Sequence, residues 1–301
     1  MIVLVRWLGK IFGINITTFG GPFKRFVSIL ANVRWTFLLA LWVLHAEDAN
    51  SGFERIALPP RVFARGLSPS YSGDVESLLL NPSAVAALQS PCVSAFHSPS
   101  PFDLSQISNV GVFVASPVKF LNVGIAVTST GFSLYRELTA TATLAKEFNG
   151  RFFVGCNINC NYLAIANYGT AYAVGIDVAA SMQVTEDLRW GISLLNVNRP
   201  TIGELNDELP QVYLTGISCE LLTTASVFLS IVKDVRYPTS GRMGVEFSPY
   251  EIVSVRFGLS DEPSRYFGGI GIHYSSVSAD YTVATHLELG LTHSFGISFG
   301  I

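Results

Sequence analysis

Charged residues are scarce in this chain of 301 residues. Asp, Glu, Lys and Arg together make up 14% of the sequence, whereas about a quarter of an ordinary soluble domain is charged. Hydrophobic residues make up 49%, and the formal net charge is -3. This balance gives no indication of nucleic-acid binding or of a basic patch that would bind a membrane surface.

Long uninterrupted hydrophobic runs are also missing after residue 46, although the mean hydropathy of the chain is +0.41. A membrane-spanning helix needs about 18 or more consecutive apolar residues. The apolar residues here are instead spread in alternation with small and polar ones. This combination favours a transmembrane β-barrel over a helical membrane protein.

Cysteine is rare as well, with four residues in the chain. Cys156 and Cys160 share one face of an alternating segment and lie about 13 Å apart along a strand. A disulfide requires Cα atoms within about 7 Å, so we expect free thiols that act as small fillers. The five histidines lack metal-ligand spacing, and no catalytic constellation is present. We expect no metal, no cofactor and no enzymatic activity.

Strict alternation is the strongest pattern that is present. Between Tyr172 and Val184 one face stays apolar over seven alternate positions, or roughly 40 Å of strand. Strands of soluble proteins average about five or six residues. Long strands with aromatic residues near their ends are typical of barrels that cross a bilayer. The closing segment alternates in the same way, and its lipid-facing, barrel-assembly set is Leu291, His293, Phe295, Ile297, Phe299 and Ile301.

About fourteen such segments follow one another from Cys92 to the end of the chain, separated by turn signals such as Asn149-Gly150. They predict an all-β fold, a transmembrane antiparallel barrel over residues 91–301. Alternation then places a set of charged residues in the lumen, where intramembrane charges generally pair with one another. The predicted lumenal set is Asp177, Arg189, Glu220, Arg256, Asp280 and Glu288, accompanied by His273 and His286. We interpret this set as a salt-bridged interior, with a specific ligand site as the alternative.

Residues 1–46 have the layout of a secretory signal region. Basic residues precede an apolar core from Trp35 to Leu44, and small residues follow it. Cleavage is expected after Ala46 or Ala49. The core is too short for a membrane anchor. Residues 1–33 exceed a normal signal n-region. Our hypothesis is that translation starts at a non-Met codon near Val27 or Leu30 and that the residues before it are a spurious N-terminal extension.

Residues 47–90 lack the alternating pattern of the strands that follow. Asn81 before Pro82 predicts a helix cap followed by proline at the first helical position, with a short Ala-rich helix after it. The segment Asn81-Pro82-Ser83-Ala84, preceded by Gly73-Asp74, resembles the N-terminal hatch of FadL-like outer-membrane barrels. The resemblance implies that residues 47–90 fold into the lumen as a plug.

The C-terminal half resembles the PorV/PorQ group of that family, which occurs in Bacteroidetes and Chlorobi. The most specific matching pieces are Asp280-Tyr281 and the later run Leu289 to His293. Two departures are Ser294, where the group has a basic residue, and Ile301, where outer-membrane strands often end in Phe. The resemblance implies an outer-membrane location and one of two roles: a type IX secretion component, or passage of hydrophobic molecules.

Loop length favours the first role. About 18 residues per strand leave little room for the long extracellular loops that would build a large substrate site. The sequence therefore predicts a non-enzymatic barrel that contacts outer-membrane lipid and docks secretion or outer-membrane biogenesis proteins. The alternative is a FadL-like transporter of hydrophobic small molecules. A transporter would require an apolar lumenal pocket beside residues 75–90 and a lateral opening in the wall, whereas a docking barrel would have a filled lumen.

Overall fold

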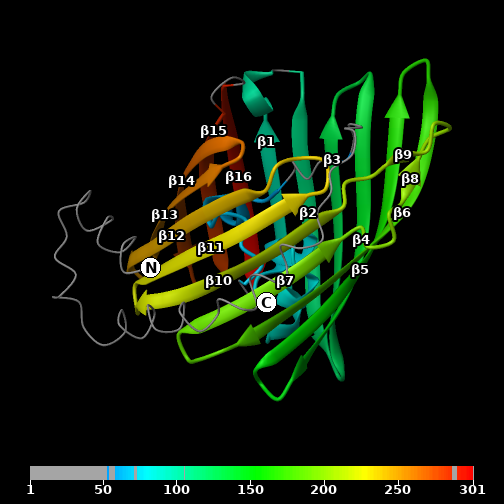
Figure 1. The fold of residues 1–301 in the computed structure, drawn as a ribbon. Coiled ribbons are helices and arrows are strands. Elements are labelled where there is room, and N and C mark those ends of the chain that lie inside the picture. The colour runs from blue at the N-terminus through cyan, green and yellow to red at the C-terminus, as the bar shows by residue number, and fades with distance from the viewer. Residues whose placement is uncertain (1–52, 54–57, 71–72, 105, 287–289, 301) are drawn as a thin grey trace. The chain divides into compact units, whose positions relative to one another are not determined.

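A computed structural model describes residues 53, 58–70, 73–104, 106–286 and 290–300, and these form a closed antiparallel barrel of fourteen strands (Figure 1). The predicted fold class is confirmed. The signal region and the residues Glu288 and Ile301 lie outside the described residues. The barrel strands are β1 Cys92–Pro99, β2 Ser108–Val118, β3 Leu121–Gly131, β4 Tyr135–Phe148, β5 Phe152–Ile165, β6 Gly169–Gln183, β7 Leu188–Leu195, β10 Val212–Leu222, β11 Ala225–Asp234, β12 Ser240–Tyr250, β13 Val253–Asp261, β14 Ser264–Tyr274, β15 Val277–His286 and β16 Gly290–Gly300.

Barrel closure comes from pairing of the first and last strands, with Cys92 opposite Gly300. Every other strand pairs with its neighbour in sequence, except that β7 pairs with β10. Between those two the chain forms a small hairpin, β8 (Thr201–Ile202) and β9 (Asp207–Glu208). A closed sheet has no free edge, so its backbone groups can be satisfied where no water is available.

The wall has its apolar side chains outside and its polar side chains inside. On β6, Val174 and Ile176 are exposed while Asp177 and Ser181 are fully buried. On β16, Phe295 is exposed, whereas Ser294 is buried in the lumen. This is the reverse of a soluble barrel and is the arrangement that lipid contact demands.

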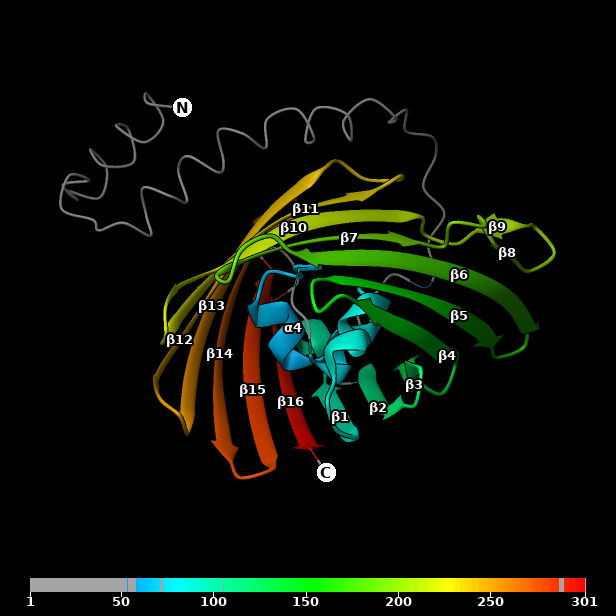
Figure 2. The ribbon, with the colours of Figure 1, turned by 90° about the horizontal axis from the view of Figure 1, so that it is seen from below.

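Three short helical segments lie in the lumen: α4 (Pro60–Ala64), η3 (Val75–Leu79) and η4 (Pro82–Ala87). We call these segments, together with the described residues between them, the plug. Figure 2 shows them inside the ring of strands. The short helix predicted after Asn81 is present as a 3-10 segment, because the Asn81 side chain accepts a hydrogen bond from the Ser83 amide at 3.0 Å. Asp74 caps η3 in the same way. None of the helices in the described ranges is long and apolar enough to cross a membrane.

Glycines in the wall allow the plug backbone to approach closely. A Cβ at Gly155 of β5 would lie 2.5 Å from the carbonyl carbon of Pro82, and one at Gly191 of β7 would lie 2.3 Å from the carbonyl oxygen of Pro69. No other residue fits such a contact without moving backbone. The small lumenal residues therefore determine where the plug is seated.

The two rims of the barrel differ. One rim, which we call the turn rim, carries tight connections such as residues 119–120 and 275–276 and the start of β1. The opposite rim, the loop rim, carries the 3-10 turn η5 (Pro101–Asp103) and the hairpin β8–β9. Outer-membrane barrels have short turns on the periplasmic side and longer loops outside the cell, so the loop rim corresponds to the extracellular side of such barrels.

Candidate functional site

A buried ionic network joins the plug to the wall. Arg65, which follows α4, donates to the Glu246 carboxylate of β12 through Nε at 2.6 Å and Nη2 at 3.1 Å. Arg256 of β13 is fully buried and donates from Nε to Glu246 at 2.9 Å and from Nη1 to Asp280 at 2.5 Å. Two guanidinium groups thus share one carboxylate, and the arrangement fixes β12, β13 and β15 to the plug.

Arg61 of α4 completes the network. Its Nη2 donates to Asp280 at 2.6 Å, while Nη1 lies 3.7 Å from Asp74. Asp74 also accepts from Arg65 Nη1 at 3.2 Å. The three guanidinium groups are therefore balanced by three carboxylates, Asp74, Glu246 and Asp280. Buried charges are tolerated when they are paired and hydrogen-bonded in this way.

Glu76 adds a fourth carboxyl group to the same region. It belongs to η3 of the plug and lies outside the membrane-spanning strands. Its Oε1 accepts from Ser94 Oγ at 2.6 Å, whereas Oε2 is buried without a hydrogen-bond partner. Burial raises the pKa of Glu76 to about 7. The negative charge of Asp74 raises it further, whereas the positive charge of Arg61 acts in the opposite direction and lowers it. A protonated Glu76 leaves the network electrically neutral.

Replacing Glu76 with Gln should stabilise the protein in a pH-dependent manner. Because the pKa in the fold exceeds its ordinary value of 4.5, the wild-type protein loses stability as the pH rises from 4.5 to about 7. We expect Glu76→Gln to raise the free energy of unfolding by about 3 kcal/mol above pH 7 and to have no effect at pH 4. Urea unfolding in detergent at several pH values measures this difference. The exposed Glu147 provides the control, and a pH-independent gain for Glu76→Gln would contradict the prediction.

A second polar cluster lies on the lumenal face of β5 and β6. Asp177 accepts from Asn157 Nδ2 at 3.2 Å, from Asn159 Nδ2 at 2.8 Å and from the Asn196 amide at 2.9 Å. Asn157 also donates to the Leu78 carbonyl oxygen of the plug at 2.9 Å. This cluster therefore supports η3 from the wall opposite the ionic network.

The remaining predicted lumenal charges are placed differently. Arg189 lies near the turn rim, where its Nε donates to Gln183 Oε1 at 2.5 Å. Glu220 is exposed at the end of β10. His273 contacts Ser254 at 2.9 Å and Ser278 at 2.8 Å, and His286 lines the cavity described below.

The predicted hatch residues are all buried. Asn81, Pro82, Ser83 and Ala84 lie in the plug, and Asn81 Nδ2 donates to the Pro69 carbonyl oxygen. Ser83 Oγ lies 2.9 Å from Ser181 Oγ of β6. On the closing strand the ring nitrogen Nδ1 of His293 lies 2.7 Å from the Tyr281 hydroxyl on the outer surface. All four cysteines are free.

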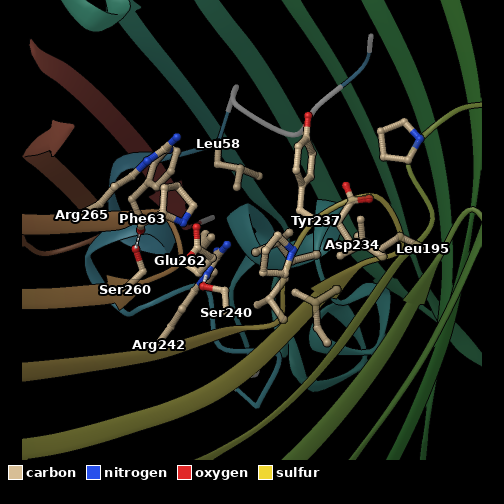
Figure 3. Close-up of a pocket in the computed structure, with 18 of the residues that line it drawn as sticks. Leu58, Phe63, Leu195, Asp234, Tyr237, Ser240, Arg242, Ser260, Glu262 and Arg265 are labelled. Atoms are coloured by element: carbon tan, nitrogen blue, oxygen red, sulfur yellow. Dashed lines mark hydrogen bonds between the residues drawn. The ribbon is translucent and has the colours of Figure 1, made fainter. Parts of the chain in front are cut away.

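An apolar cavity of about 450 Å³ lies between the plug and the wall on the side of the loop rim (Figure 3). The plug and the segment before it supply Leu58, Phe63, Leu67 and Leu80. The wall supplies mainly apolar side chains from the loop-rim ends of its strands, namely Leu195, Val212, Leu214, Val232 and Phe267. Polar side chains lie toward the mouth and one wall: Asp234, Tyr237, Ser240, Arg242, Ser260, Glu262, Arg265 and His286.

The plug closes the lumen beyond the cavity. Leu78, Ala84 and Val85 are fully buried between the plug and strands β3 to β6. The cavity volume lies within the range of small-molecule sites, which is about 300–1,000 Å³. The site is therefore a hydrophobic pocket that can hold one small organic molecule, with its floor formed by a separate, hydrogen-bonded plug.

The fold is that of the FadL-type outer-membrane channels, a class of fourteen-stranded barrels with N-terminal helical turns. Over 83% of this chain and 99% of the other, it superimposes on the CymD monoaromatic hydrocarbon channel with a TM-score of 0.63 at 11% identity. The toluene transporter TbuX of Ralstonia pickettii gives 0.60 at 11% identity, and a Pseudomonas aeruginosa FadL homologue gives 0.60 at 9%; each matches over 83% of this chain and all of its own. No protein-family profile and no curated protein matches the sequence.

Sequence identities this low show a shared fold and not a shared ligand. The FadL-type fold expected from the Asn81-Pro82 segment is present, whereas the narrower resemblance to the PorV/PorQ group stays a prediction. The cavity was not predicted as a formed site, and neither were Arg61, Arg65, Glu76 and Glu246, which build the network. Glu246 lies at an alternate position from Arg242 on β12, so alternation could have assigned it to the lumen.

Proposed function

We propose that the protein is a channel for hydrophobic small molecules in the outer membrane. The observation that carries the proposal is the apolar cavity of about 450 Å³ between plug and wall. Burying an apolar ligand there releases about 25 cal/mol for each Å² of apolar surface removed from water. The fold shared with the hydrocarbon channels CymD and TbuX supports the same reading.

The cavity supplies a first binding step and the plug supplies a barrier. A ligand that enters from the loop rim would contact Leu195, Val212 and Leu214 of the wall together with the plug residues that line the same cavity. The plug then obstructs the path of polar solutes, and it is held in place by Asn157, Ser230 and Thr282 of the wall, which donate to its backbone carbonyl oxygens. Onward passage requires a displacement of the plug or an opening between strands.

Filling the cavity should block uptake. Val212→Trp introduces a large side chain into the cavity, whereas Val178→Trp places the same side chain on the lipid-facing surface of β6. The probes are labelled toluene and labelled benzoate, supplied to cells that lack other hydrocarbon channels. We expect the first variant to lower the uptake rate of at least one probe at least about ten-fold and the second to leave it unchanged. Equal uptake of both probes by the wild type, Val212→Trp and cells without the protein would refute the proposed function.

Partner docking in type IX secretion is the second candidate function. The plugged lumen and the tight connections at the turn rim support it, together with the sequence resemblance to the PorV/PorQ group. Deleting the gene separates the two functions: a channel role predicts lost uptake with unchanged secreted proteins, and a docking role predicts the opposite. We rank the channel first because a docking scaffold does not require the cavity.

We further propose the chain organisation as signal region 1–46, plug segment 47–90 and barrel 91–301. An outer-membrane location requires export, which the basic and apolar segment before residue 46 would direct. N-terminal sequencing of the mature protein tests this proposal. A mature chain that begins near residue 47 would support it, and one that retains residues 1–33 would contradict both the cleavage and the spurious extension.

A further inference from the structure

Arg242 differs from the three arginines of the ionic network, Arg61, Arg65 and Arg256. It lies on β12 and lines the apolar cavity, and its Nε donates to Ser240 Oγ at 3.1 Å. Arg61, Arg65 and Arg256 each have a carboxylate within 3.2 Å. Within the part of the chain that the structure describes, Arg242 has no carboxylate within 4.0 Å.

The acidic groups around this part of the cavity are exposed or bonded to other groups, and of these the Asp261 carboxylate acts on the Arg242 charge from beyond 4.0 Å. Asp261 Oδ1 accepts from the Gly241 amide at 2.7 Å, and Asp234 is paired with Arg236 at 2.9 Å. Glu262 lines the mouth and is exposed. Arg265 adds a second positive charge to the same wall, with its guanidinium 5.7 Å from the centre of the Phe102 ring.

A guanidinium group that faces an apolar cavity and has no carboxylate within 4.0 Å can bind an anion. Its planar fork matches a carboxylate with two parallel hydrogen bonds. Partial removal of water makes the attraction stronger than it would be on the surface. A neutral hydrocarbon would cover Arg242 without compensating its charge, so the cavity should disfavour a ligand with no anionic group.

Aromatic rings lie beside this positive wall. Phe63 of the plug and Phe267 of β14 both line the cavity, and their ring centres are 5.8 Å apart with an angle of 22° between the planes. His286 lines the same side and meets Phe102 edge-on at 5.8 Å. Flat rings pack well against such aromatic faces and gain about 0.5–1.5 kcal/mol beyond simple burial.

We propose that the cavity selects compact aromatic acids, with the ligand carboxylate on Arg242 and the ring against Phe63 and Phe267. The aliphatic side chains of Leu67, Leu80 and Leu214 would cover the far edge of the ring. This inference rests on the proposed channel function and names its substrate class. It distinguishes the protein from the toluene and monoaromatic hydrocarbon channels of the same fold, whose named ligands are neutral.

Titration calorimetry with the full barrel in detergent tests the inference. The ligands are 2-naphthoate, its neutral isostere 2-naphthamide, and decanoate, a carboxylate without a ring. We expect the wild type to bind 2-naphthoate at least about ten-fold more tightly than either of the others. Arg242→Gln should remove the preference over the amide, and Arg242→Lys should retain part of it.

Circular dichroism checks that each variant is folded, and Arg151→Gln at the exposed turn rim is the matched control. Equal binding of naphthoate and naphthamide by the wild type would overturn the inference, as would a preference that survives in Arg242→Gln. Decanoate binding as tight as naphthoate would overturn the aromatic class. In each of these cases, toluene uptake that Val212→Trp abolishes would still support the channel function. If this dependence on Val212 were absent as well, both proposals would be refuted.

Discussion

Replacing Arg256 with Met should reduce the free energy of unfolding by about 3–5 kcal/mol, which is the usual effect of breaking a buried ion pair. Arg256 is fully buried and contacts Glu246, Asp280 and Ser254. Its loss leaves three carboxylates to two guanidinium groups in a buried region. Urea unfolding in detergent, followed by tryptophan fluorescence, measures the change.

Two further variants make this prediction specific. Arg151→Met removes an exposed arginine from the turn between β4 and β5 and should change stability by less than about 0.5 kcal/mol. The double variant Arg256→Met, Asp280→Asn restores the charge balance and should recover part of the loss. An Arg256→Met protein as stable as the wild type would show that the network does not hold the plug to the wall.

A single methyl group at Gly155 should displace the plug. Gly155→Ala places a Cβ 2.5 Å from the carbonyl carbon of Pro82, which neither backbone can avoid without moving. Overpacking of this kind costs about 1–3 kcal/mol. We expect the variant to fold as a barrel with a loosened plug, and cells that carry it to become more sensitive to large polar antibiotics.

Gly268→Ala is the matched control for this substitution. Gly268 is also within a strand, but a Cβ there would lie 3.8 Å from the Val283 side chain, which is an ordinary contact. The two variants have the same change in side chain and in strand propensity, so their difference isolates contact with the plug. Equal antibiotic sensitivity of the two variants would indicate that the plug does not depend on the close approach at Gly155.

Alternation predicts the barrel well because lipid acts on every strand in the same way. Each outward position must be apolar, so the pattern persists from β2 to β16 and needs no knowledge of tertiary contacts. The cap at Asn81 is equally local, since it depends on residues two positions apart. Sequence alone did not predict the hairpin β8–β9, because its residues carry no sustained alternation.

The ionic network was predicted only in part. Asp280 and Arg256 lie at lumenal positions of regular strands and could be assigned from alternation. Arg61 and Arg65 lie in the irregular segment before them, and their partners are about 180 to 220 residues away. Pairing at such distances depends on how the plug is seated, which the local pattern does not contain.

The preferred interpretation of the sequence did not include the cavity; only the alternative, a transporter, required an apolar lumenal pocket beside residues 75–90. The sequence argument for partner docking rested on connection length, which measures loops and not the fit between plug and wall. The volume arises where Leu80 and Phe63 of the plug fail to fill the space beside Leu214 and Phe267. Such a mismatch between two surfaces is a property of their assembled positions.

The seating of the plug constrains the order in which the protein can assemble. α4 contacts strands β13 to β16, η3 contacts β1 to β3, and η4 contacts β3 to β6. The plug precedes all of these strands in the chain, yet the closing pair joins the first strand to the last. We infer that the N-terminal segment is enclosed while the sheet is still open, and that it serves as an internal template around which the strands curl. Catalysed insertion into the membrane would then have to preserve a partly formed barrel in which the plug is already bound.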